Sequence, residues 1–230
     1  MQKKVALLHS VFVMVEPLID LFKEHLPDVK VVNIVDDSIL PEVMENGGPT
    51  PNVVKRVCRY VTTAEEIGCD LLISVCTTMA DIMDLASKLV KMPILKIDEP
   101  MVDKALEMTE RLLLVATFEP TLEPSSRFIQ KRANELGKDV SIKKVHCKGA
   151  FEAMLDGDKE THDRIVVDSI KGAERDFKAV ILAQGSMAPL RSRVEDETMI
   201  PVFASPLLAV LRAKDILYSK NHLINNGNIM

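Results

Sequence analysis

The sequence lacks the cysteine pattern of a zinc site or a redox motif. Its four cysteines show no C-x-x-C spacing and no flanking cluster of histidines; they are Cys58, Cys69, Cys76 and Cys147. Structural zinc sites and dithiol redox motifs depend on such closely spaced ligands. We therefore expect neither of these sites, and the reducing cytoplasm is the expected compartment.

Excess positive charge and long apolar runs are also missing. The formal net charge is −5 and the isoelectric point is near 5.6. Nucleic acids and anionic membranes need a clustered positive field, so neither is an expected partner. No apolar run approaches the length that spans a bilayer. The stretch before His9 holds only four clearly apolar residues, too few for a signal peptide.

What the sequence does contain is an alternation of short runs rich in Val, Ile and Leu with longer segments of helical periodicity. This order predicts parallel βαβ units. We expect strands at 5–9, 29–35, 71–75 and 94–97. One helix should begin at Pro17, a second should be capped by Asn52, and a third should bury Ile82, Leu85, Ala86 and Leu89. Pro100 is expected to close this half.

The same order begins again in the second half of the chain. Strands are expected at 111–116, 140–145, 179–183 and 202–204, and a helix that ends at Gly137 should bury Leu136. Met79-Ala80 returns as Met187-Ala188 and Pro93 as Pro201, each 108 positions later. The repeat predicts an α/β protein of two pseudo-symmetric halves, each a mostly parallel four-stranded sheet flanked by helices.

The first half should span residues 1–105 and is a candidate to include part of the C-terminal helix. The second half should span residues 106–216, and residues 217–230 should form a tail. In open parallel sheets, ligands bind beyond the carboxyl ends of adjacent central strands. This rule brings the ends of the first and third strands of both halves to one cleft. The residues at those ends are His9, Cys76, Thr117 and Gln184.

Cys76 lies in the segment S-V-C-T-T, between a strand and the start of a helix. The free N–H groups and dipole of a helix start favour negative charge, so this cysteine should carry more thiolate than usual. Thr77 and Thr78 can cap the helix or offer hydroxyl groups to a carboxylate. The alternative is a buried structural cysteine beside two capping threonines.

The two halves and the S-V-C-T-T motif resemble the aspartate/glutamate racemase superfamily, which includes hydantoin racemase, maleate isomerase and arylmalonate decarboxylase. The resemblance covers roughly residues 4–214. It implies a small carboxylate substrate, no cofactor and no metal, and a homo-oligomer of two or more chains. It also implies two cysteines, one in each half, that face the substrate's α-carbon from opposite sides.

The sequence departs from that pattern because Gln184 stands 108 positions after Cys76, where the second cysteine would fall. An amide cannot act as a general acid or base. Two chemical alternatives to racemisation follow: a one-cysteine decarboxylase and a cis–trans isomerase. A protein that only binds a small acid is the third alternative. In each, Gln184 would orient a carboxylate or stabilise an oxyanion.

Six further residues at the strand ends are candidate substrate ligands, each with a structural alternative. Thr117 and Thr121 resemble the family's carboxylate-binding turn, but helix capping is the alternative role. Gly185 and Ser186 correspond in position to Thr77 and Thr78 and could bind an anion through a backbone N–H and a hydroxyl group. The alternative is that they only form an ordinary turn. The remaining two candidates are Ser10, which an ST-turn would also explain, and His9, which could contact ligand or thiolate or be structural.

Two regions are expected to lie outside the regular structure. The stretch 36–51 is predicted to be irregular and is either a lid over the cleft or a plain surface loop. The residues 221–230 have no counterpart in the first half and are predicted to be mobile. His25, His162 and His222 are expected at the surface.

Overall fold

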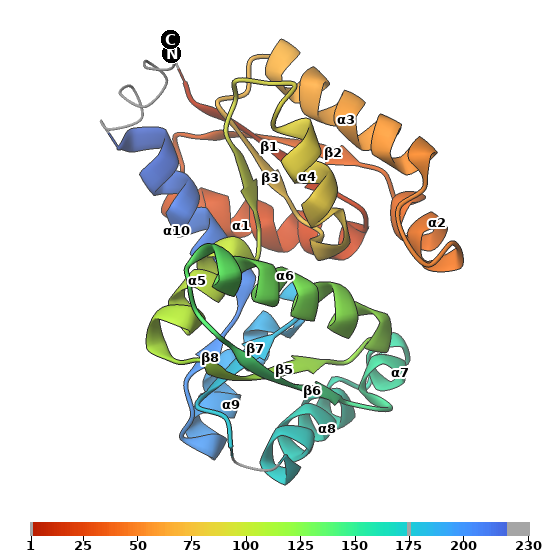
Figure 1. Ribbon diagram of the computed structural model, residues 1–230, viewed down its shortest axis with the longest axis vertical. Helices are drawn as coiled ribbons and strands as arrows, with labels where there is room; N and C mark the ends of the chain where they lie inside the picture. The colour runs from red at the N-terminus through yellow and green to blue at the C-terminus, as the bar shows by residue number, and fades with distance from the viewer. Residues whose placement is uncertain (1, 174–175, 220–230) are drawn as a thin grey trace.

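The computed structural model describes residues 2–173 and 176–219 and contains two four-stranded parallel sheets (Figure 1). The first has the order β2-β1-β3-β4, with β1 (Lys4–His9), β2 (Lys30–Val35), β3 (Leu71–Ser74) and β4 (Ile94–Lys96). The second has the order β6-β5-β7-β8, with β5 (Arg111–Ala116), β6 (Ser141–His146), β7 (Ala179–Leu182) and β8 (Val202–Phe203). The predicted fold class is confirmed.

Helices connect the strands in the same order in both halves. Those up to β5 are η1 (Phe12–Met14), α1 (Val15–His25), α2 (Ile39–Glu45), α3 (Pro51–Glu66), η2 (Thr77–Met79), α4 (Ala80–Ala86) and α5 (Glu99–Met108). Those after β5 are η3 (Glu119–Thr121), α6 (Leu122–Glu135), α7 (Ala150–Leu155), α8 (Lys159–Gly172), η4 (Gly185–Leu190), α9 (Arg191–Thr198) and α10 (Ser205–Tyr218).

Each sheet is covered on both faces, which explains the continuous apolar runs of the central strands. One face of the first sheet packs on α1 and α10, and the other packs on α2, α3 and α4. One face of the second sheet packs on α5 and α6, and the other on α7, α8 and α9. The four core layers contain fully buried side chains such as Leu7, Leu72, Leu114 and Val180.

The two halves exchange a helix. Helix α5 follows a strand of the first sheet, yet its Met101 and Leu106 belong to the core of the second sheet. Helix α10 follows a strand of the second sheet, yet its Ala209 and Ala213 belong to the core of the first. The two helices lie against each other where the halves meet (Figure 1). The apolar burial of these two helices therefore stabilises the association of the halves.

Two predicted helix faces are wrong in part. In α4 the buried residues are Ala80, Ile82, Met83 and Ala86, whereas Leu85 is 49% exposed. Leu89 lies beyond the end of this helix and is 56% exposed. Leu136 follows α6 and is also exposed. Leu85 lies within α4 but on its outer side, whereas Leu89 and Leu136 lie past the ends of their helices.

Two prolines begin helices. Pro51 is the first residue of α3, and the cap is Thr50, whose Oγ1 accepts a hydrogen bond from the Val53 N–H at 3.2 Å. The predicted cap Asn52 is therefore wrong. Pro100 lies in the first turn of α5, so it does not close the half as predicted. Both positions fit the preference of proline for the first helical turn, where its missing N–H costs nothing.

The stretch 36–51 is not wholly irregular, because Ile39–Glu45 within it forms α2. Arg56 of α3 holds this segment through an ion pair with Asp36 at 3.0 Å and a second one with Glu42. The Tyr60 hydroxyl also donates a hydrogen bond to Asp36 at 2.8 Å. The prediction failed because the two anchoring residues, Arg56 and Tyr60, lie on a different helix, where sequence periodicity does not reveal them.

His162 is not at the surface: it is 2% exposed on α8, with Nδ1 at 2.7 Å from Asp163. The expected tail 217–230 begins inside α10, and its residues 220–230, with His222, lie outside the described residues. Within the part of the chain that the structure describes, no helix has both the length and the apolar character needed to cross a membrane.

The corrected face of α4 yields a stability prediction. Ile82→Ala should lower the free energy of unfolding by about 2–5 kcal/mol, because it leaves a cavity under the helix. Leu85→Ala, in the same helix but half exposed, should change it by no more than about 0.5 kcal/mol. Urea denaturation of both variants measures the difference. Equal losses would contradict this assignment of the helix face.

Candidate functional site

The turns after the central strands meet where the two halves touch. The turn η1 follows β1 and packs against η4, which follows β7. The turn η2 follows β3 and packs against α6, which follows β5. At the first contact the fit is close: a Cβ atom built on Gly185 would lie 2.9 Å from Sδ of Met14. The predicted strand ends of both halves therefore border one interface.

Cys76 and Gln184 occupy equivalent places in the two halves. Each stands two residues after the third strand of its sheet and directly precedes a 3-10 helix. Their backbones are similarly extended, with φ and ψ of −146° and 120° for Cys76 and −127° and 133° for Gln184. Both side chains are partly exposed. The offset of 108 residues therefore reflects a structural equivalence.

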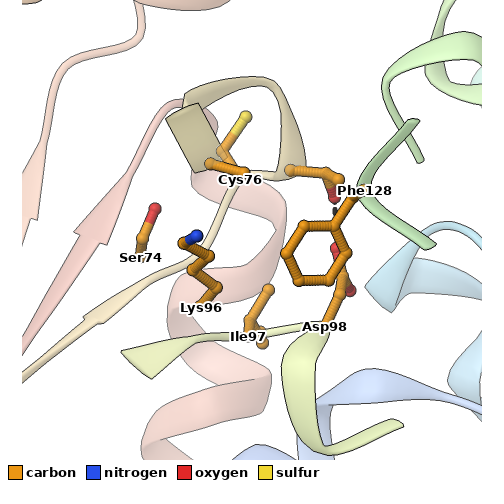
Figure 2. A pocket seen from close by; sticks show the side chains of 8 residues that line it. Ser74, Cys76, Lys96, Ile97, Asp98 and Phe128 are labelled. Atoms are coloured by element: carbon orange, nitrogen blue, oxygen red, sulfur yellow. Dashed lines mark hydrogen bonds between the residues drawn. The ribbon is translucent and has the colours of Figure 1, made fainter. Parts of the chain in front are cut away.

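The thiol of Cys76 contacts a neighbouring hydroxyl: its Sγ lies 2.8 Å from Oγ1 of Thr78. Below it is a small pocket with about 160 Å³ of empty space, in which Phe128 is the one lining residue from the second half. In Figure 2 the sulfur points away from Phe128 and from Asp98. The pocket therefore reaches the base of Cys76 and not the thiol itself.

Asp98 is a site residue that the sequence analysis missed. It is 7% exposed and lies beyond the end of β4, where it accepts hydrogen bonds from Thr77 Oγ1 and from Ser205. Burial raises the pKa of Asp98, although the two hydrogen bonds oppose the shift. The Thr77 hydroxyl is thus engaged inside the protein and does not face outward to a carboxylate. The strand-end rule, extended to the fourth strand, would have found Asp98.

The same pocket contains two further polar groups that the sequence did not single out. Lys96 of β4 forms an ion pair with Asp84 and lies 5.6 Å from the ring centre of Phe128. Ser74, at the end of β3, is 1% exposed, and its Oγ has no hydrogen-bond partner among the described residues. Asp84 also pairs with Lys131 of α6 at 2.6 Å, so charged groups bridge the halves at this pocket.

Gln184 is held by the turn after β5. Its Oε1 accepts three hydrogen bonds, from the Thr117 N–H at 2.8 Å, from the Thr117 hydroxyl at 3.1 Å and from the Phe118 N–H at 3.1 Å. Parallel pairing of β5 with β7 brings these two strand ends together. The structure thus joins two predicted site residues, Thr117 and Gln184, and adds Phe118 to them.

His9 and Ser10 are almost completely buried at the end of β1. Nε2 of His9 lies 3.0 Å from Oδ1 of Asn33 on β2, and Nδ1 has no hydrogen-bond partner within residues 2–173 and 176–219. Burial lowers the pKa of His9, although the hydrogen bond to Asn33 opposes this shift. A neutral imidazole supplies no positive charge to a thiolate, so of the roles considered for His9, hydrogen bonding fits this environment better than charge pairing.

Three other predicted residues, Thr121, Gly185 and Ser186, also lie in the strand-end turns. Thr121 ends η3 and makes no capping hydrogen bond to α6, which argues against its alternative role as a cap. Ser186 is partly exposed in η4. Gly185 faces Met14 and Pro206, so its free side is filled by the protein. No group of three His, Cys, Asp or Glu side chains among the described residues could hold a metal ion.

The comparisons with known proteins agree with this architecture. The model of the Asp/Glu/hydantoin racemase family matches residues 8–213. No curated protein matches the sequence significantly. Among solved structures, a Bacillus anthracis glutamate racemase isoform is similar with a TM-score of 0.72 and 18% identity, over 98% of this chain and 85% of the other.

Two more solved structures share the fold. A Picrophilus torridus aspartate racemase has a TM-score of 0.66 and 19% identity, over 92% of this chain and 94% of the other. A Klebsiella pneumoniae allantoin racemase has a TM-score of 0.67 and 15% identity, over 94% and 87%. The two-sheet arrangement thus extends over nearly the whole length of all these chains.

The buried carboxyl of Asp98 leads to a pH prediction. With its pKa raised in the folded state, Asp98 binds its proton more tightly there than in the unfolded chain, where the pKa is about 3.9. Its stabilising contribution is present below about pH 3.9 and is lost as the pH rises through the folded-state value. Asp98→Asn, which cannot ionise, should therefore gain stability relative to the parent as the pH rises from about 4.

Denaturant midpoints of the parent and the variant, measured from pH 4 to pH 8, test whether the stability of the variant relative to the parent rises with pH. Asp139→Asn serves as a control at an exposed loop carboxyl and should leave the pH dependence of the parent unchanged. A difference between Asp98→Asn and the parent that stays constant or falls with rising pH would contradict the raised pKa.

Proposed function

Because this chain belongs to the Asp/Glu/hydantoin racemase family, we propose that it transfers a proton at the α-carbon of a small carboxylic acid, with Cys76 as the transferring group. Family membership supports racemase-type chemistry. The observation that carries the assignment to Cys76 is that it is a partly exposed thiol at the end of a central strand, in the turn that borders the other half.

The other three cysteines are less suited to proton transfer. Cys147 also follows a strand, but it is fully buried, and burial raises its pKa to about 11. Burial also raises the pKa of Cys69 and of Cys58, which lie away from the strand-end turns. A thiol whose proton is held this tightly is a poor base near neutral pH.

In the proposed reaction the Cys76 thiolate takes the α-hydrogen as a proton and becomes a thiol. The electron pair of the broken C–H bond moves into the substrate carboxylate to give an enediolate. Return of a proton to the same face restores the starting acid, whereas return to the opposite face inverts it. Gln184, at the equivalent position of the second half, has no proton that titrates near neutral pH. We therefore propose one-sided proton transfer rather than two-base racemisation.

The same observation favours a second candidate function. A single thiol opposite a carboxamide suffices for a decarboxylase that protonates an enediolate, or for a cis–trans isomerase that adds the thiolate to a double bond. In both, the Gln184 side chain would orient or stabilise the charged intermediate through its N–H₂ group. The remaining alternative is a protein that only binds small acids. Binding of an acid without exchange at the α-carbon, decarboxylation or isomerisation would favour this alternative.

The role of Cys76 is tested by hydrogen–deuterium exchange at the α-carbon. In D₂O, NMR should show exchange with at least one acid from a panel of aspartate, glutamate and related small acids. Cys76→Ser should slow that exchange by about 10²–10⁴-fold, the usual contribution of a positioned acid or base. Cys58→Ser, a partly buried thiol on α3, is the matched control. Exchange that survives in Cys76→Ser would exclude this thiol as the base.

Gln184→Cys tests whether the second half lacks only a proton-transferring group. Because the two positions have similar backbone conformations, the new thiol should reach the opposite face of the same α-carbon. Exchange without inversion in the parent should become exchange with inversion in the variant, as measured by chiral chromatography of the recovered acid. Inversion in the parent at the rate of exchange would contradict one-sided transfer.

A further inference from the structure

Three hydrogen-bond donors converge on one atom in the second half. The backbone N–H groups of Thr117 and Phe118 and the hydroxyl of Thr117 all point at Oε1 of Gln184, at 2.8 to 3.1 Å. Consecutive backbone N–H groups that share one acceptor form a concave anion-binding nest. Such a nest is built for a carboxylate oxygen, yet here a neutral carboxamide oxygen fills it.

The nest is fixed from several sides. Thr117 is only 3% exposed, and its carbonyl lies 3.3 Å from Nε2 of His146 on β6. On the Gln184 side, the Ala183 N–H donates to Val115 of β5 at 2.9 Å. The ring of Phe118 also contacts that of Phe151, with their centres 4.9 Å apart. The three donors are therefore positioned before any ligand arrives.

The first half has no such internal occupant. Cys76 stands where Gln184 stands in the second half, and Ser10 and Val11 follow β1 as Thr117 and Phe118 follow β5. Among the described residues, the thiol bonds with Thr78, and no hydrogen bond joins it to Ser10 or Val11. The two halves therefore differ in one respect: the side chain after the third strand closes the donor turn only in the second half.

We propose that Gln184 is an internal ligand that closes a carboxylate-binding nest formed by Thr117 and Phe118, and so decides which acids the cleft accepts. This deepens the proposed function, since the nest borders the cleft that would hold the same substrate. With Oε1 engaged, Gln184 presents its N–H₂ group, which makes no hydrogen bond within the described part of the chain. The second half then offers the ligand the amide donor of Gln184 in place of the three donors of the nest.

Acetate is the probe for the nest, because it carries one carboxylate and cannot react. Backbone amide shifts of Thr117 and Phe118 are followed by NMR during an acetate titration, with sodium chloride at equal ionic strength as the ion control. In the full-length parent these two amides should not shift. In Gln184→Ala they should shift saturably, with an affinity for acetate at least about tenfold higher than in the parent, because the freed donors can form charge-assisted hydrogen bonds to the carboxylate.

Two further variants keep the test decisive. Gln184→Glu places a carboxylate of similar length in the nest, so it should remain closed to acetate. Gln130→Ala, at a glutamine on α6 that does not line the pockets, should behave as the parent. Acetate shifts at Thr117 and Phe118 in the parent, or their absence in a folded Gln184→Ala, would overturn the proposal. The titration involves no turnover, so its outcome is independent of the exchange test on Cys76.

Discussion

The contact between the strand-end turns of the two halves is the constraint on which the rest of this structure depends. The pairing of η1 with η4 and of η2 with α6 places side chains from distant parts of the chain along one interface. The exchanged helices α5 and α10 reinforce it, since each is buried in the core of the opposite sheet. In a protein of two separate halves, the turns that carry Cys76 and Gln184 would not meet the opposite half.

The two halves share a fold but differ in chemistry. The first half carries a thiol, a buried imidazole with a lowered pKa and a buried carboxyl with a raised pKa, which are Cys76, His9 and Asp98. The second half has Gln184 locked against the turn after β5. In the proposed function, proton transfer belongs to the first half and hydrogen-bonding selection to the second. This division rests on the presence of a thiol in one half and of an amide at the equivalent position of the other.

The sequence predicted the features that follow from local pattern and failed where distant residues decide. Apolar runs and the repeat predicted all eight strands within two residues, as well as the equivalence of Cys76 and Gln184. Helix α2 was missed because its partner Arg56 lies on another helix. The burial of His162 was missed because it depends on how α8 packs against α7 and α9. Asp98 was missed because it follows the fourth strand, whereas the strand-end rule points to the central strands. The hydrogen bond from Thr77 to Asp98 was missed because it joins two separate turns.

The central claim is that the thiol of Cys76 and the amide of Gln184 face one small anion across the interface of the halves. A crystal structure of the parent protein with malonate tests it most directly. We expect a malonate bound between Sγ of Cys76 and Nε2 of Gln184, with Oε1 of Gln184 still bonded to Thr117 and Phe118. Malonate bound away from both side chains, or a cleft in which the thiol and the amide are too far apart for one small acid to bridge, would contradict the account.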